Sequence, residues 1–445
     1  MVTQDRFPPG LNNAFYFALC NALSFQIVLS SPMVLFAKTL GASATVLGII
    51  TGMMPLLVIF QIPAANYLPR VGYKRFVFAG WGIRVLFIFA MAMVPWTGSF
   101  LNHTTQIVLI LSLLFGFNLS RGISSCAWLP WITSIVPQSM RGRYLVLDTA
   151  SQNASSFVAF MIAAWALGAA PQPSQFAGIF AFSALTGLLS LSFLKKIPDG
   201  PGPEEASHSS TPVPWREIAH YPPFRKLLRM NIAWALGYGG MIAFTVAYLK
   251  SDGGFNERQI LMLSSIYFLG GLTSLAFGHH MDRMGSKPIL AFGCGVWLLI
   301  ATGWTLLASG TLPTTGLMIV MLEFLMGLGY ALFNTSNLRL AMVISPTMGR
   351  SHFFAMFQVV SNLTLGLSPI VWGLLMDGLG ASEWRFHRFI INHYVIFFVG
   401  AGCFFGVTAI LVRALEEPSA ARVQALLREV LIDGPQRVWA RLMTR

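Results

Sequence analysis

The stretch Gly278-His-His-Met-Asp-Arg-Met-Gly-Ser-Lys-Pro288 separates two apolar runs, at about 260–281 and 288–309. Each run is long enough to cross a bilayer, since a membrane-spanning helix needs about 20 apolar residues. The stretch therefore predicts a tight polar hairpin between two membrane helices. Gly278 permits a close approach of the two helices, and Gly285 permits the positive φ that such a turn needs.

The charged side chains of this hairpin are suited to contacts with neighbouring helix ends. Asp282 only accepts hydrogen bonds, whereas Arg283 and Lys287 only donate them, so all three can form charge-assisted hydrogen bonds. His279 and His280 are not expected to bind a metal, because adjacent residues on a helix point about 100° apart. We predict no metal site here.

A second copy of the hairpin, Ala65-Asn-Tyr-Leu-Pro-Arg-Val-Gly-Tyr-Lys-Arg75, lies far upstream. When the two copies are aligned, Arg70, Gly72 and Lys74 match Arg283, Gly285 and Lys287 of the later copy, and Pro69 takes the place of Asp282. A repeat at this spacing predicts two similar halves, a frequent arrangement in transporters.

The composition indicates a membrane protein with many spans. Hydrophobic residues make up 55% of the chain and charged residues only 10%, too few charges for a soluble protein of 445 residues. The opening segment is polar and the first apolar run is too long for a cleavable signal, so none is expected. Twelve spans are predicted, at 12–37, 44–66, 76–96, 106–134, 145–169, 176–194, 227–249, 260–281, 288–309, 314–343, 352–376 and 389–413.

The net charge of +13 reflects orientation in the membrane and does not indicate nucleic-acid binding. With the spans above, 21 of the 29 lysines and arginines fall on one side. By the positive-inside rule that side is cytoplasmic and holds both termini. The four cysteines all lie in predicted spans without metal or disulfide spacing, so we interpret them as packing residues.

The motif G-x-x-x-D-R-x-G-x-K, with its upstream copy, resembles the loop motif of the major facilitator superfamily, and the resemblance extends over about residues 10–414. It implies an all-α membrane protein with twelve transmembrane helices in two pseudo-symmetric six-helix bundles. The cavity would be lined by the helices over 12–37, 106–134, 227–249 and 314–343. The expected parts are an N-terminal bundle (1–194), a cytoplasmic linker (195–226), a C-terminal bundle (227–414) and a cytoplasmic amphipathic tail on the membrane surface (415–445).

The resemblance also implies that the hairpins gate the cavity. Asp282 is expected to cap the helix that starts near 142–146 when the cytoplasmic side closes, whereas Pro69 cannot make the matching contact, so closure is expected to be asymmetric. The predicted gating residues are Arg70, Gly72, Lys74, Arg143, Gly278, Asp282, Arg283, Gly285 and Lys287.

Polar and aromatic side chains share one face on several predicted helices, which places them toward the interior of a bundle. Two interpretations stay open, contact with a solute and hydrogen bonds between helices. Gly237, Gly239 and Gly240 predict a break in the helix over 227–249. The candidate cavity residues are Asn21, Ser24, Asn118, Arg121, Ser125, Trp128, Gln152, Asn231, Trp234, Tyr238, Tyr330, Asn334 and Gln358.

Four charged residues inside spans are candidates for function. Arg121 offers the planar pair of donors that suits a carboxylate or phosphate. Glu323 would carry a proton or serve as a counter-ion to the arginine. Asp148 and Arg84 are further candidates for proton coupling or charge balance, and a structural ion pair is the alternative for each.

These features predict a secondary transporter of a small polar or anionic solute that works by alternating access, with proton coupling left open. The alternatives are an exporter of amphipathic compounds and a transport-inactive receptor or scaffold. No enzyme is expected, because no nucleophile, base and oxyanion donors occur together. We expect no cofactor and no nucleic-acid partner, contact with membrane lipid, a monomer, and location in a bacterial cytoplasmic membrane.

Overall fold

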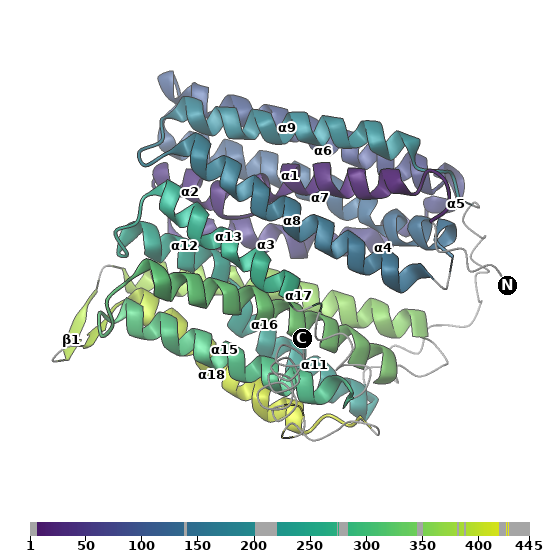
Figure 1. The fold of residues 1–445 in the computed structure, drawn as a ribbon. Coiled ribbons are helices and arrows are strands. Elements are labelled where there is room, and N and C mark those ends of the chain that lie inside the picture. Colours follow the sequence, from purple (N-terminus) through teal and green to yellow (C-terminus); the bar gives the residue numbers. More distant parts are fainter. Residues whose placement is uncertain are drawn as a thin grey trace, which may run out of the picture.

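The computed structural model describes residues 7–137, 140–200, 220–273, 275, 284–344, 350–380, 382–386, 389–417, 424 and 426. Long helices pack side by side in two bundles (Figure 1). The first bundle holds α1 (Asn12–Leu29), α2 (Ser31–Thr39), α3 (Ala44–Leu57), η1 (Val58–Phe60), α4 (Gln61–Ala65), α5 (Leu68–Val71), α6 (Tyr73–Met93), η2 (Val94–Ser99), α7 (His103–Ile135), α8 (Arg141–Leu167) and α9 (Pro173–Lys196).

The second bundle repeats this plan and adds a short hairpin of two antiparallel strands near its last helix. Its elements are α11 (Pro222–Tyr238), α12 (Met241–Ser251), α13 (Glu257–Thr273), α15 (Ser286–Ala308), α16 (Gly316–Ile344), α17 (Arg350–Leu379), β1 (Trp384–Phe386), β2 (Phe389–Ile391) and α18 (His393–Arg413). We call the end of the molecule that carries β1 and β2, at the left of Figure 1, the hairpin end. The opposite end, which carries Lys74 and Arg413, is called the basic end.

The helix boundaries confirm the internal repeat. The helices α13, α15 and α16 begin at Glu257, Ser286 and Gly316, and their counterparts α3, α6 and α7 begin at Ala44, Tyr73 and His103. The separation along the chain is the same for all three pairs, and it equals the separation between Arg70 and Arg283 in the two hairpins. Residues at this constant offset therefore occupy equivalent depths in the two halves.

The predicted number of twelve spans is met only approximately. Among the described residues, ten helical segments are long and apolar enough to cross a membrane. The two predicted spans that are not among these ten are the fifth, which corresponds to α8, and the eighth, which corresponds to α13. The described part of α13 has 17 residues, and polar side chains such as Asp148, Gln152 and Asn153 lower the hydropathy of α8.

Large apolar side chains cover the outside of the bundles. Trp165 is 79% exposed, Leu317 72%, Leu86 68% and Ile410 65%. Such exposure of large apolar side chains is unfavourable in water. These residues are therefore the ones that face lipid, and the protein is an integral, multi-pass membrane protein.

Two membrane helices are interrupted near mid-depth. The first breaks between α1 and α2 at Ser30, which has an extended backbone. The seventh breaks between α11 and α12 at Gly239 and Gly240, and Gly240 has a φ of +87°. The break in the seventh helix was predicted from its glycines, but the sequence did not predict the break in the first. Irregular backbone at this depth is tolerated where it lines a cavity.

Glycines set the closest contacts between helices. A Cβ on Gly48 of α3 would lie 2.2 Å from the carbonyl oxygen of Pro369 in α17, a helix of the other half. Within the second half, a Cβ on Gly327 of α16 would lie 1.8 Å from the carbonyl oxygen of Tyr267 in α13. The absence of a side chain at Gly327 therefore allows α13 to approach α16 and fixes the position of Tyr267.

Replacing Gly327 by alanine should destabilise the protein, because the added methyl group forces α13 and α16 apart. Overpacking of this kind costs about 1–3 kcal/mol. The matched control is Gly295→Ala, since a Cβ at Gly295 meets no atom within 4 Å. Thermal unfolding of the purified variants should show a lower Tm for Gly327→Ala alone, and equal Tm values would contradict the packing argument.

Candidate functional site

A cavity of about 590 Å³ lies between the two halves. The first half contributes α1, α2, α3, α7 and α8, and the second contributes α11, α12, α13, α16 and α17. The four helices expected to line it all do so, and the second, fifth, eighth and eleventh helices line it as well. Its polar lining consists of Gln26, Ser30, Ser31, Thr51, Arg121, Thr149, Asn153, Tyr238, Thr245, Ser264, Tyr267, Glu323, Tyr330, Asn334 and Thr335.

The cavity extends from mid-depth toward the basic end. Leu145 and Val146, in the first turns of α8, line it on one side, and Leu275, beyond the end of α13, lines it on the other. The helices α2 and α12 begin at its inner end, since Ser30, Ser31, Gly239 and Gly240 all line it. Their N-termini therefore direct the positive ends of two helix dipoles into the cavity.

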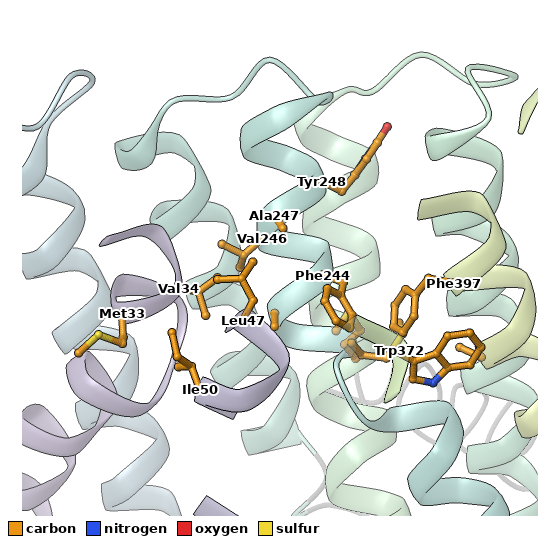
Figure 2. Packing of buried hydrophobic residues seen from close by; sticks show 14 of the residues in the cluster. Met33, Val34, Leu47, Ile50, Phe244, Val246, Ala247, Tyr248, Trp372 and Phe397 are labelled. Atoms are coloured by element: carbon orange, nitrogen blue, oxygen red, sulfur yellow. The ribbon is translucent and has the colours of Figure 1, made fainter. Parts of the chain in front are cut away.

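An apolar seal closes the hairpin end. Val34 of α2 and Leu47 of α3 face side chains of α12 in the second half (Figure 2), and Met33 of α2 lies in the same buried cluster. Phe244 and Val246 of α12 belong to the same buried cluster, and each of these five residues is at most 1% exposed. The two halves are thus packed together on this side of the cavity.

Asp377 adds a polar link to the seal. Its carboxylate, at the end of α17, accepts hydrogen bonds from the backbone N–H groups of Ala44 (2.9 Å) and Thr45 (2.8 Å) at the start of α3. The negative charge also suits the positive end of the α3 dipole. The contact joins the halves, because α17 belongs to the second and α3 to the first.

A backbone contact joins the other pair of facing helices. The N–H of Arg258 in α13 donates a hydrogen bond to the carbonyl of Gly168, which follows α8, at 3.0 Å.

Burial raises the pKa of the Asp252 carboxyl above its ordinary value, and the charges of His393 and Lys38 oppose this change.

Arg121 and Glu323 face the cavity from opposite halves. Arg121 belongs to α7 and Glu323, which is 4% exposed, to α16. Neither side chain forms a hydrogen bond or ion pair with a described residue, and they do not pair with each other. Among the described residues that line the cavity, they are the one cation and the one anion.

Three tyrosines line the cavity together with Glu323. The hydroxyls of Tyr238 and Tyr267 lie 3.4 Å apart. Tyr330 stacks on Tyr238 with ring centroids 5.0 Å apart. We call Tyr238, Tyr267 and Tyr330 the tyrosine group. All three line the cavity.

Five of the candidate residues predicted from the sequence line the cavity: Arg121, Tyr238, Glu323, Tyr330 and Asn334. The offset of the repeat makes Arg121 and Asn334 equivalent positions. The two halves therefore present one side chain each at the same depth of the cavity.

The other candidates lie outside the cavity lining and contact neighbouring groups. Arg84 is 1% exposed, donates to Asn21 and lies between the rings of Trp81 and Phe117. Asp148 accepts a hydrogen bond from Gln152 at 2.7 Å. The remaining contacts are those of Ser24 with Ser183, Asn118 with Leu114, Ser125 with Gly122, Trp128 with Phe17, Asn231 with Asn337, Trp234 with Phe333, and Gln358 with Asn362.

The predicted gating lysines contact their own halves. Lys74 forms an ion pair with Asp199, at 3.4 Å. Lys287 donates to the carbonyls of Arg413 and Leu415, at 2.9 and 2.7 Å.

Glu416 and Glu417, which follow Leu415, strengthen the link that Lys287 forms within the second half. Glu417 accepts hydrogen bonds from the backbone of Ser286 and Lys287 at the start of α15. Lys226 donates to Glu416 and holds the pKa of that carboxyl below its ordinary value.

The remaining gating residues fall into three groups. Gly72 and Gly285 have φ values of +81° and +88°, which confirms the need for glycine in both hairpins. Arg70 is exposed, and the guanidinium of Arg143 lies over the ring of Phe7, 5.3 Å from its centroid. The other three, Gly278, Asp282 and Arg283, lie outside the described residues, as does most of the predicted tail.

Sequence reasoning missed several lining residues. Gln26, Asn153 and Tyr267 line the cavity but were not candidates. Ser264, Tyr267 and Gly271 recur at helical spacing along α13, a pattern that could have indicated the cavity-facing side of that helix.

The sequence was then compared with protein families. The family model described as Major Facilitator Superfamily matches residues 14–322 and 237–442. The chain belongs to the Major Facilitator Superfamily. A comparison with curated proteins found no match.

Solved structures of the same superfamily share the fold. A mutant of the nucleoside transporter NupG is 15% identical, with a TM-score of 0.68, and the match covers 92% of this chain and 100% of that one. The xylose transporter XylE from E. coli, in an inward-open conformation, is 12% identical, with a TM-score of 0.69 and coverage of 93% and 99%. A POT family transporter in complex with 5-aminolevulinic acid is 13% identical, with a TM-score of 0.69 and coverage of 92% and 96%.

Removing the Asp377 carboxylate should favour opening at the hairpin end. Loss of an N-cap costs about 0.5–2 kcal/mol, and 1.4 kcal/mol corresponds to about a tenfold change in an equilibrium. The test uses a protein that lacks the four native cysteines and carries a single cysteine in place of buried Leu47. A thiol reagent added from the hairpin side should therefore label this cysteine faster in Asp377→Ala.

The matched control is Asn102→Ala, which removes the N-cap of α7 within the first half. This variant should lose stability without faster labelling. Equal labelling rates in the two variants would show that Asp377 does not hold the halves together.

Proposed function

We propose that this protein is a secondary active transporter that moves a small polar or anionic solute across the membrane by alternating access. The observation that carries the proposal is the cavity between the halves, which reaches toward the basic end, is sealed at the hairpin end, and contains Arg121 and Glu323 without partners among the described residues. An unpaired charge within a membrane protein is costly, so both residues are functional candidates.

The chemistry of the cavity supports a polar cargo. Arg121 offers planar paired donors for a carboxylate or phosphate. The N-termini of α2 and α12 add backbone donors and partial positive charge at the inner end. The related structures are of transporters for nucleosides and xylose and of a POT family member with 5-aminolevulinic acid, all small polar solutes.

The proposed orientation places the basic end in the cytoplasm, in accord with the positive-inside rule. The structure then corresponds to an inward-open conformation, and the seal of α2, α3 and α12 faces outward. We place the protein in a bacterial cytoplasmic membrane, with both termini inside.

Export of amphipathic compounds is the second candidate, and the apolar part of the cavity wall favours it. Phe25, Leu29, Phe160 and Phe268 line the same space. An exporter of this kind would depend on these side chains. Transport that is insensitive to both Arg121 and Glu323 would favour the exporter.

Arg121→Lys should weaken solute binding although it keeps the charge, because the planar fork of donors is lost. A hydrogen bond to a charged group contributes about 1.5–3 kcal/mol, which corresponds to a loss of about tenfold or more in affinity. Binding and uptake should be measured in proteoliposomes. Arg229→Lys, a change of an exposed arginine on α11, is the control and should behave like the parent protein.

Glu323→Gln should remove the pH dependence of uptake while binding stays largely intact, since the amide resembles the protonated acid. An anionic solute neutralises Arg121 and leaves the negative charge of Glu323 uncompensated. A proton on Glu323 removes that charge, so uptake by the parent protein should rise as the pH falls. Uptake should be followed over a pH series, with exposed Glu416→Gln as control. If Arg121→Lys and Glu323→Gln both transport like the parent across this series, the two residues are structural.

A further inference from the structure

The two charges of the cavity differ in their surroundings. On the first half, Arg121 lies close enough to Arg84 for the two cations to repel each other, and Arg84 donates one hydrogen bond to Asn21 and lies over two aromatic rings. Arg121 is thus the cavity-facing cation of a positive wall. A carboxylate or phosphate on a ligand suits this wall, and an amine does not.

The second half presents the opposite chemistry. Glu323 lines the cavity together with Tyr238, Tyr267 and Tyr330, and no lysine, arginine or histidine of the described second half lines it. Tyrosine rings attract cations through their faces, and tyrosine hydroxyls accept hydrogen bonds. Glu323 and the tyrosine group therefore form a wall that suits an ammonium group.

From these two walls we infer that the solute is bipolar, with an anionic group that binds Arg121 and an ammonium group that binds Glu323 within the tyrosine group. This inference rests on the proposed function and narrows its substrate class to zwitterions. Bound in this way, the solute leaves each charge of the cavity paired. An anionic solute pairs only Arg121, so Glu323 then needs a proton.

The repeat sets the orientation of the solute. Arg121 is equivalent to Asn334, which lies beyond Glu323 along α16 in the direction of the basic end. The two positions on α16 are about three helical turns apart, which is about 16 Å of depth. The ammonium group therefore binds deep, next to the seal, and the anionic group binds nearer to the opening. An elongated molecule with its charges at opposite ends fits this arrangement.

Binding of four matched compounds to the purified full-length protein tests the inference. The compounds are 6-aminohexanoate, glycylglycine, hexanoate (no amine) and hexylamine (no acid), and their binding is measured by thermal stabilisation and by competition. At least one zwitterion should bind ten times or more as tightly as either single-charge compound. If hexanoate binds as tightly as both zwitterions, or if no zwitterion stabilises the protein, the inference is wrong.

Variants assign each end of the ligand to its wall. Glu323→Gln should reduce zwitterion affinity about tenfold and bind hexanoate at least as tightly as the parent, while Arg121→Gln should weaken zwitterions and hexanoate alike. Asp252→Asn, an acid outside the cavity lining, is the matched control and should change neither. If Glu323→Gln weakens hexanoate and the zwitterions equally, Glu323 does not bind the amine.

Proton uptake gives an independent readout. In a weakly buffered solution, binding of the zwitterion should take up about one proton fewer per molecule than binding of hexanoate, because the ammonium group replaces a proton on Glu323. Equal proton uptake would overturn the inference. If hexanoate is carried in an Arg121-dependent manner while an amine adds nothing, this inference fails and the proposed function stands. If no compound is carried in an Arg121-dependent manner, the proposed function fails too.

Discussion

A membrane protein must satisfy each charge and each peptide group from within, because lipid offers no hydrogen bonds. This constraint explains most of the polar contacts. Arg84 is enclosed by Asn21 and two aromatic rings, and Asp377 is held by the backbone at the start of α3. Arg121 and Glu323 depart from the rule, and both face the cavity. The cavity thus holds two charged side chains that have no hydrogen bond or ion pair with a described residue.

The same polar contacts divide into two kinds. Lys74 and Lys287 tie the start of the third helix of each half to the segment after the sixth, so each half is braced within itself at the basic end. Asp377 and Arg258 join the halves at the hairpin end. Two bodies that are each braced at the basic end and joined by hydrogen bonds at the hairpin end are suited to rocking about the cavity, as alternating access requires.

The fold could be predicted almost completely from the sequence, because the hydrophobic runs and the internal repeat are strong signals. The site was predicted less well. Helical spacing shows that Asn21 and Asn231 face the interior of a bundle, but it cannot show that Arg84 and Asn337 occupy the space in front of them.

The parts that escaped prediction had weaker local signals than the repeat and the hydrophobic runs. The break at Ser30 has no glycine, unlike the break at Gly240, and its one signal is Pro32 in the first turn of α2. Tyr267 belongs to a helix that was expected to lie outside the lining, and its place depends on the close contact at Gly327, far along the chain. Such tertiary contacts decide which of several inward-facing residues reach the cavity.

The apolar seal in Figure 2 also determines where the membrane voltage acts. When the cavity is open to water at the basic end, it shares the potential of that side, so the voltage falls mainly across the seal at the hairpin end. Each unit charge that changes sides gains or loses about 2.3 kcal/mol per 100 mV. When Arg121 and Glu323 are both ionised, their charges cancel and a change of access carries no current. A proton on Glu323 leaves the arginine uncompensated, and the same movement then becomes electrogenic.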